Sequence, residues 1–142
     1  KPYMILGSLR EQLCYPTEVS KFSDDHLSSV LKEVNLNSIL ERYPNLDVKQ
    51  DWPRILSLGE QQRLAFGRLL LNSPQFAVLD EATSALDIET EKYLYSLLIK
   101  RELSIISVGH RPTLKEFHNN VLALNGKGNW QLLPTKNYNF DN

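Results

Sequence analysis

A chain of 142 residues, 42% hydrophobic and 23% charged, is long enough to form one globular domain with a buried core. Sixteen lysines and arginines balance seventeen aspartates and glutamates, and no dense basic run of the kind that binds nucleic acid or an anionic membrane is present. Cys14 is the only cysteine, which excludes an internal disulfide, and the apolar runs are too short to span a bilayer. We therefore expect a soluble chain from a reducing compartment, without a nucleic-acid partner.

The first half of the chain has helical periodicity. Four apolar residues fall on one face of a predicted helix: Leu27, Val30, Leu31 and Val34. Ser23 or Asp24 can cap the start of this helix, and a short second helix is expected around residues 39–43, ended by Pro44. Residues 45–54 are polar and contain Pro53, so this segment is predicted to be a loop.

A longer helix is predicted from about residue 59 to 71, with its buried side formed by Ala65, Phe66, Leu69 and Leu70. The sequence Asn72-Ser73-Pro74 ends it. Residues 76–79 are then continuously apolar, which is typical of a strand that is buried on both faces.

A helix over about residues 88–102 follows that strand, with Glu89 and Glu91 near its N-terminus, where the helix dipole favours acidic groups. Residues 103–108 are predicted to be a second buried strand, which completes a βαβ unit of a parallel sheet. A closing hairpin is expected from two further apolar runs joined by a glycine-containing loop, residues 121–124 and 130–133.

One candidate site is the start of the helix near residue 59, where LSLGEQ occupies residues 56–61. Unpaired backbone N–H groups at a helix N-terminus attract an anion, and Gly59 lets the backbone approach it closely. Ser57 and Glu60 also have the spacing of an ordinary capping box, which is the commoner explanation of such a pattern. The two interpretations are compatible.

A second candidate site is the acidic pair Asp80 and Glu81, which follows the apolar run at residues 76–79. Ligands of open α/β sheets bind at the carboxyl ends of the strands, where this pair is expected to lie. One carboxylate there can hold Mg²⁺ and its neighbour can orient or activate an attacking water. For an isolated strand, two solvated acids before a turn would be the simpler explanation.

The order of the motifs favours the functional interpretation. Four motifs follow one another along the chain: LSLGEQ, the strand with Asp80 and Glu81, SALD at residues 84–87, and His110 after the second strand. In this order they strongly resemble the ATP-binding cassette (ABC) family. They are similar to its signature motif, its Walker B strand with the catalytic glutamate, its D-loop and its switch histidine. Leu58 and Glu60 depart from the commonest Gly and Gln of the signature.

The resemblance extends from Lys1 to about Leu133, but only to the later part of the family's ATPase domain. No Gly-x-x-x-x-Gly-Lys-Ser/Thr phosphate loop occurs in the chain, and the segment from Lys1 resembles the residues just after the family's Q-loop glutamine. We therefore expect the chain to come from a longer polypeptide. GSLREQLCYP at residues 7–16 and WPRILSLGE at residues 52–60 look most like exporters of the peroxisomal fatty-acyl type and their bacterial relatives.

The implied fold is an α/β, P-loop NTPase-like ABC ATPase fragment. The resemblance predicts a helical subdomain with the signature motif over residues 1–72, and the rear part of the ATPase core, with part of the parallel sheet and a C-terminal hairpin, over residues 73–142. The full-length protein would be an ATPase that drives transport, with ATP and Mg²⁺ as ligands. It would lie at the cytoplasmic face of a membrane, joined to a transmembrane domain.

The resemblance also implies a role for each matched residue. Asp80 would help to position Mg²⁺, Glu81 would polarise the attacking water, and His110 would contact the γ-phosphate. In the family two cassettes pair head to tail, so Ser57 and the Gly59 backbone would meet the γ-phosphate of ATP held by the partner cassette.

Two further residues belong to the predicted interface between cassettes. Asp87 would stabilise the dimer face near the opposite site. Glu60 would bring a negative charge close to phosphate, which weakens the contact unless its side chain faces elsewhere; the sequence leaves this open.

Two other functions compete with transport. An ABC ATPase that acts on DNA or on the ribosome shares these motifs, although the basic surfaces or coiled-coil insertions often found in such proteins are not visible here. A binding or regulatory module without catalysis is also compatible with the fold, but the intact Glu81 and His110 argue against it. Without a phosphate loop, residues 1–142 alone are predicted to be inactive.

Overall fold

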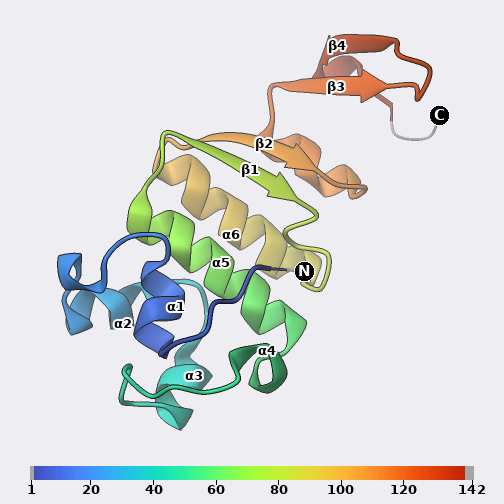
Figure 1. Ribbon diagram of the computed structural model, residues 1–142. Helices are drawn as coiled ribbons and strands as arrows, with labels where there is room; N and C mark the ends of the chain where they lie inside the picture. Colours follow the sequence, from blue (N-terminus) through green and yellow to red (C-terminus); the bar gives the residue numbers. More distant parts are fainter. Residues whose placement is uncertain (1, 140–142) are drawn as a thin grey trace.

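The computed structural model describes residues 2–139 and has an α/β architecture. Figure 1 shows a cluster of short helices at one end, two long helices beneath a small sheet, and a separate hairpin near the C-terminus. The small helical elements of the first part are α1 (Leu9–Cys14), η1 (Val19–Lys21), α2 (Asp24–Glu33), α3 (Asn37–Arg42) and α4 (Trp52–Ile55). This combination confirms the predicted class of a helical part joined to a piece of a parallel-sheet core.

The predicted helices of the first part form as expected. Ser23 is the N-cap of α2, and its side chain accepts a hydrogen bond from the backbone N–H of His26 at 3.3 Å. The residues of the predicted apolar face of α2 are buried, because α2 packs against α5 and α3. The second predicted helix is α3, with Tyr43 as its C-cap.

The prediction of a loop throughout residues 45–54 is wrong at its end. Helix α4 begins at Trp52, and Pro53 occupies its first turn, where a missing N–H breaks no helical hydrogen bond. Trp52 is fully buried, and its indole Nε1–H donates to the carbonyl of Gly7 at 2.9 Å. Burial of this large side chain therefore fixes the segment that leads into LSLGEQ.

The second part contains α5 (Leu58–Asn72), β1 (Phe76–Asp80), α6 (Ile88–Lys100) and β2 (Ser104–Val108). β1 and β2 pair in parallel, from Phe76 opposite Ser104 to Asp80 opposite Val108, which confirms the predicted βαβ unit. Helices α5 and α6 lie side by side under one face of this sheet (Figure 1). One continuous core runs through both parts of the chain; that residues 1–72 and 73–142 act as separate subdomains stays a prediction.

The strands are buried on one face only, so the prediction of burial on both faces is wrong. Ala77 and Leu79 point into the core, whereas Phe76 and Val78 are 65% and 71% exposed. In β2, Ile106 is likewise exposed. The physical reason is that α5 and α6 cover one face, and no element within residues 2–139 covers the other.

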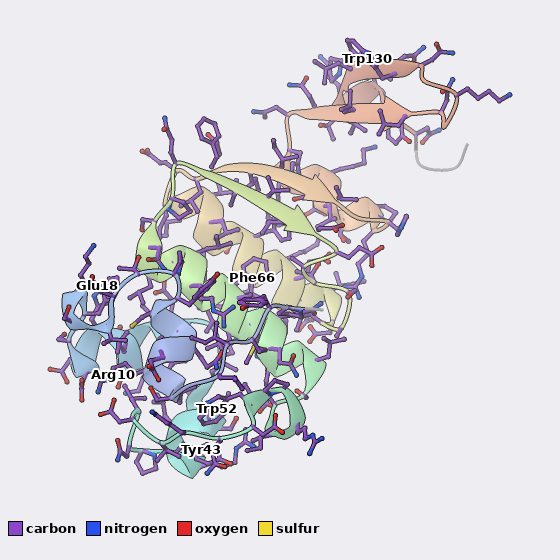
Figure 2. The ribbon with its side chains drawn as sticks, in the orientation of Figure 1. Arg10, Glu18, Tyr43, Trp52, Phe66 and Trp130 are labelled. Atoms are coloured by element: carbon purple, nitrogen blue, oxygen red, sulfur yellow. The ribbon has the colours of Figure 1, made fainter. Side chains whose placement is uncertain are left out.

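The predicted hairpin is confirmed as β3 (Asn120–Leu124) and β4 (Trp130–Pro134), which pair antiparallel. Between β2 and β3 lies η2 (Pro112–Phe117), and η3 (Thr135–Asn137) follows β4. Figure 2 shows Trp130 on the hairpin, far from the core residues Trp52 and Phe66. The hairpin therefore adds little to the core that supports the site.

Candidate functional site

The acidic pair lies where β1 ends. Asp80 is the last residue of the strand and is exposed, opposite Val108 of β2. Glu81 follows with a left-handed backbone, φ 45°, which is uncommon for a residue with a side chain. Its N–H donates to the carbonyl of Val108 at 2.9 Å, so the sheet ladder holds this turn in place. Such backbone strain is typical of functional positions.

His110 comes from the neighbouring strand end. Its Nε2 lies 3.2 Å from a carboxylate oxygen of Glu81, and its side chain is 90% exposed. At the residue before it, Gly109, any larger side chain would require Leu114 to shift, because a Cβ there would lie 2.6 Å from Cδ1 of Leu114. The structure thus brings Asp80, Glu81 and His110 to one edge of the sheet, as the sequence predicted.

A buried glutamine, which the sequence analysis did not identify, connects this edge to α5. The side-chain nitrogen of Gln62 donates to the carbonyl of Glu81 at 3.3 Å and to the hydroxyl of Ser84 at 3.0 Å. Its oxygen accepts from the N–H of Ala85 at 3.0 Å. The loop after β1 is therefore fixed to the helix that carries the signature-like motif. A polar residue at a buried helical position was the available signal.

Glu91 is a second residue whose place in the site the sequence analysis did not identify. It lies in the first turn of α6, as predicted, and it is also completely buried. Glu91, Leu94, Tyr95 and Leu98 share one face of the helix, at spacings of three, four and seven residues. A carboxylate within an apolar stripe of this kind was the signal that could have identified it.

The start of α5 is an ordinary capping box, as the simpler interpretation predicted. The hydroxyl of Ser57 accepts from the N–H of Glu60 at 3.2 Å, and the Glu60 carboxylate accepts from the N–H of Ser57 at 2.8 Å. Its other oxygen forms an ion pair with Arg42 at 2.7 Å. The Glu60 side chain thus faces its own helix cap and a cation, which reduces the negative charge it presents to the surroundings.

Gly59 packs against the D-loop-like segment, residues 84–87, and Asp87 is the last residue of that segment. A Cβ at Gly59 would lie 3.3 Å from Leu86 and 3.4 Å from the carbonyl of Ala85, so close packing accounts for this glycine within the chain. Asp87 is the N-cap of α6 and accepts hydrogen bonds from the N–H and the hydroxyl of Thr90, both at 2.8 Å. These bonds hold the pKa of Asp87 below its usual value.

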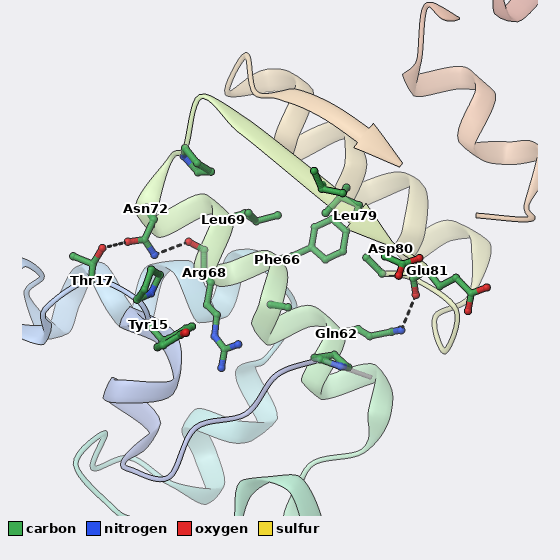
Figure 3. A pocket seen from close by; sticks show the side chains of 16 residues that line it. Tyr15, Thr17, Gln62, Phe66, Arg68, Leu69, Asn72, Leu79, Asp80 and Glu81 are labelled. Carbon is green, nitrogen blue, oxygen red and sulfur yellow. Dashed lines mark hydrogen bonds between the residues drawn. The ribbon is translucent and has the colours of Figure 1, made fainter. Parts of the chain in front are cut away.

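A groove of about 540 Å³ runs between α5 and β1. Figure 3 shows Asp80 and Glu81 at one end of it, and Tyr15 and Thr17 at the other. Arg68 lies along it and is partly buried, and its guanidinium donates to the carbonyls of Gln12 and Tyr3, each at 2.6 Å. Burial lowers the pKa of Arg68.

Asp80 is a suitable Mg²⁺ ligand, but one carboxylate alone does not complete the coordination of the ion. Within residues 2–139 no three His, Cys, Asp or Glu side chains are close enough together to hold a metal ion. Magnesium is commonly held by one or two carboxylates, with waters and substrate phosphates as the other ligands. An exposed carboxylate at the end of β1 fits this pattern.

Comparison with known proteins decides the family. The model of the family described as "ABC transporter" matches residues 6–84, more than half of the chain. The chain belongs to the ABC transporter family. In this family context, the signature-like motif and the acidic pair fall within the matched segment, and His110 lies beyond it.

Individual ABC transporters agree with the predicted branch. The chain is 50% identical over 137 residues to an uncharacterised ABC transporter ATP-binding protein of Synechocystis, which covers 96% of the chain and 21% of that protein. It is 42% identical over 136 residues to rat ATP-binding cassette sub-family D member 3, with 92% of the chain and 21% of that protein covered. The resemblance to this branch and its bacterial relatives is confirmed.

A solved structure supports the fold. A bacterial Atm1-family ABC exporter with ATP bound has a TM-score of 0.72 and 26% identity, covering 87% of this chain and 22% of that one. The chain thus spans about a fifth of the length of the curated relatives it matches. None of the helices formed by residues 2–139 has the length and apolar character to cross a membrane.

Proposed function

We propose that this chain is the rear part of an ATP-hydrolysing cassette that drives a membrane transporter. The observation that carries the proposal is the meeting of Glu81 and His110, 3.2 Å apart and open to solvent, at the ends of adjacent parallel strands. That edge is where open α/β sheets bind their ligands. Membership of the ABC transporter family makes ATP the ligand to expect there.

Each of these residues has a distinct task in the proposed reaction. Water attacks the γ-phosphorus and displaces ADP, so the charge that develops on the phosphoryl oxygens must be stabilised. The Glu81 carboxylate polarises and orients the attacking water, and His110 donates a hydrogen bond to a γ-phosphate oxygen. Asp80 helps to hold Mg²⁺, which neutralises phosphate charge when bound.

The start of α5 belongs, in this proposal, to the second ATP of a head-to-tail pair of cassettes. Ser57 and Leu58 are exposed, as a surface that meets a partner must be. The helix N-terminus and the Gly59 backbone favour an anion, which here is the γ-phosphate held by the partner. Asp87, at the start of α6, lies in the same proposed interface, with Glu60 turned towards Arg42.

Other parts of the transporter must come from outside this chain. The phosphate loop is absent from the sequence, and the relatives are about five times longer. We propose that a front segment of the same polypeptide supplies that loop, and that a transmembrane domain joins the cassette to its cargo at the cytoplasmic face of a membrane.

The test is hydrolysis of ATP by the longer polypeptide that contains this chain. Glu81→Gln should reduce kcat at least about a hundredfold while ATP binding persists, because a general base is lost and the binding groups are not. Glu89→Gln, an exposed glutamate a short distance along the chain, is the matched control and should leave turnover unchanged.

Residues 1–142 alone should show no measurable ATP hydrolysis, because they contain no phosphate loop. Clear turnover by this segment that Glu81→Gln abolishes would contradict the proposed division of labour. Full activity of the Glu81→Gln variant of the longer polypeptide would overturn the proposed role of Glu81 itself.

A further inference from the structure

Glu91 of α6 is a fully buried carboxylate for which the proposed reaction has no use. Its two oxygens accept hydrogen bonds from the hydroxyls of Thr83, at 2.6 Å, and Thr113, at 2.5 Å. The guanidinium of Arg111 donates to it at 3.2 Å and neutralises its charge. A buried carboxylate is tolerated only with such partners, so this network is a built feature of the fold.

The partners of Glu91 come from the two loops that carry the reacting groups. Thr83 lies two residues after Glu81, in the loop that follows β1. Arg111 directly follows His110, in the loop that follows β2, and it also donates to the carbonyl of Ser84 at 3.2 Å. One carboxylate on α6 therefore connects both loops from beneath.

Glu91 cannot itself reach a nucleotide. It is 0% exposed and both of its oxygens have protein donors, although it borders a small cavity of about 150 Å³ that Glu81 and His110 also line. Its effect must pass through the loops that it holds. Because the side chains of Glu81 and His110 are 55% and 90% exposed, neither is fixed by packing around itself.

We propose that Glu91, with Thr83 and Arg111, is a positioning device that fixes the spacing between Glu81 and His110 for the hydrolytic step. This inference rests on the proposed function. Loss of Glu91, Thr83 or Arg111 should therefore lower kcat rather than raise KM. Misplacement of a catalytic group by about 1 Å can cost about a hundredfold in rate, while the groups that bind ATP remain in place.

The experiment compares Thr83→Val with Thr83→Ser in the longer polypeptide that contains this chain. Valine keeps the shape of threonine but removes the hydroxyl that donates to Glu91, whereas serine keeps the hydroxyl. Thr83→Val should lower kcat about tenfold or more, with KM for ATP within about twofold of the unchanged protein. Thr83→Ser should stay close to the unchanged protein, and Glu91→Gln should behave like Thr83→Val.

Thr135→Val is the matched control. The hydroxyl of Thr135 is also buried and donates to the carbonyl of His118 at 2.7 Å, but Thr135 belongs to η3, beyond the hairpin. Its loss removes a comparable hydrogen bond without touching the network, and hydrolysis should be unchanged. Melting temperatures of all variants show whether each remains folded at the assay temperature.

Three results would overturn the inference. The first is a Thr83→Val variant with unchanged kcat. The second is equal impairment of Thr83→Val and Thr83→Ser, or of Thr83→Val and Thr135→Val, since that pattern indicates a structural role alone. The third is a failure of the protein without substitutions to hydrolyse ATP. This result would overturn the proposed function as well, and it differs from the other two because those require an active starting protein.

Discussion

Arg42 forms an ion pair with Glu60 and thereby partly neutralises the charge of this signature residue. Glu60 replaces the glutamine that is commonest at this place in the family signature, and its charge weakens a contact with phosphate unless the side chain faces elsewhere. In the structure Arg42, from α3, lies 2.7 Å from it, and the capping box uses its other oxygen. The departure from the family pattern is thus compensated within the chain.

This compensation can be measured in the folded chain. Arg42→Gln should lower the free energy of unfolding by about 0.5–1 kcal/mol, since it removes a partly exposed ion pair. In a Glu60→Gln background the same change should cost less, because no charge is left unpaired. Chemical denaturation of the four proteins gives the coupling energy.

An equal loss in both backgrounds would contradict the ion-pair explanation. Arg42 also lies 5.8 Å from the ring centre of Tyr43, and that contact persists in the Glu60→Gln background. Arg42 Nε also donates to the carbonyl of Ser38 at 3.2 Å, and the double-mutant comparison separates the ion pair from both of these contacts.

At the scale of elements, α6 depends on its cap. Asp87 accepts both hydrogen bonds from Thr90, and its pKa is lowered by them. A carboxyl with a lowered pKa stabilises the fold above its unfolded pKa of about 3.9, and the stabilisation is lost as the pH falls through the lower, folded value. Capping by Asp87 should therefore weaken in acid.

The prediction concerns three proteins. Asp87→Ala should be less stable than the unchanged chain at neutral pH, and the difference should shrink as the pH falls below about 4. Asp87→Asn caps without titrating, so its advantage over Asp87→Ala should not shrink in this way. Denaturant midpoints between pH 3 and 7 test this; a constant difference between the unchanged chain and Asp87→Ala would contradict it.

The helices were the most predictable elements, because periodicity and caps are local properties. The apolar face of α2 and its Ser23 cap could be predicted from a few adjacent residues. Pro53 was misinterpreted because the same residue breaks a helix interior and favours a first turn. The burial of Trp52 decided between these two outcomes, and it depends on Gly7, 45 residues away.

Those residues of the candidate site that directly follow a strand could be predicted from the sequence. Asp80, Glu81 and His110 could be placed on one edge because parallel strands bring their carboxyl ends together. Gln62 and Glu91 were missed because their partners lie in loops whose paths the sequence pattern does not specify. Long-range hydrogen bonds of this kind become visible only in three dimensions.

At the scale of the whole molecule, the uncovered face of the β1–β2 sheet is the most unusual feature. Phe76, Val78, Ile106 and Val108 expose apolar side chains there. Contiguous apolar surface promotes association of an isolated chain. We therefore expect residues 1–142 to self-associate as the concentration rises.

Val78→Thr combined with Ile106→Thr should increase the monomeric fraction, because threonine keeps the β-branched shape and presents a hydroxyl to water. The cost in unfolding free energy should stay within about 0.5 kcal/mol per substitution, as both side chains are exposed. Light scattering after size exclusion measures the first quantity and denaturation the second.

Leu79→Ala, on the opposite face of the same strand, is the contrasting variant and should cost about 2–5 kcal/mol. A chain that is monomeric at every concentration before substitution would show that the exposed face does not drive association.

The carboxamide of Gln62 uses both of its ends, the nitrogen towards Glu81 and Ser84 and the oxygen towards Ala85. A glutamate at this position would lack the donor and a leucine would lack both groups, so few replacements could keep the connection. The helix that begins after Ser57 is consequently coupled to the turn that holds Glu81, and a change in the tilt of this helix would displace that turn.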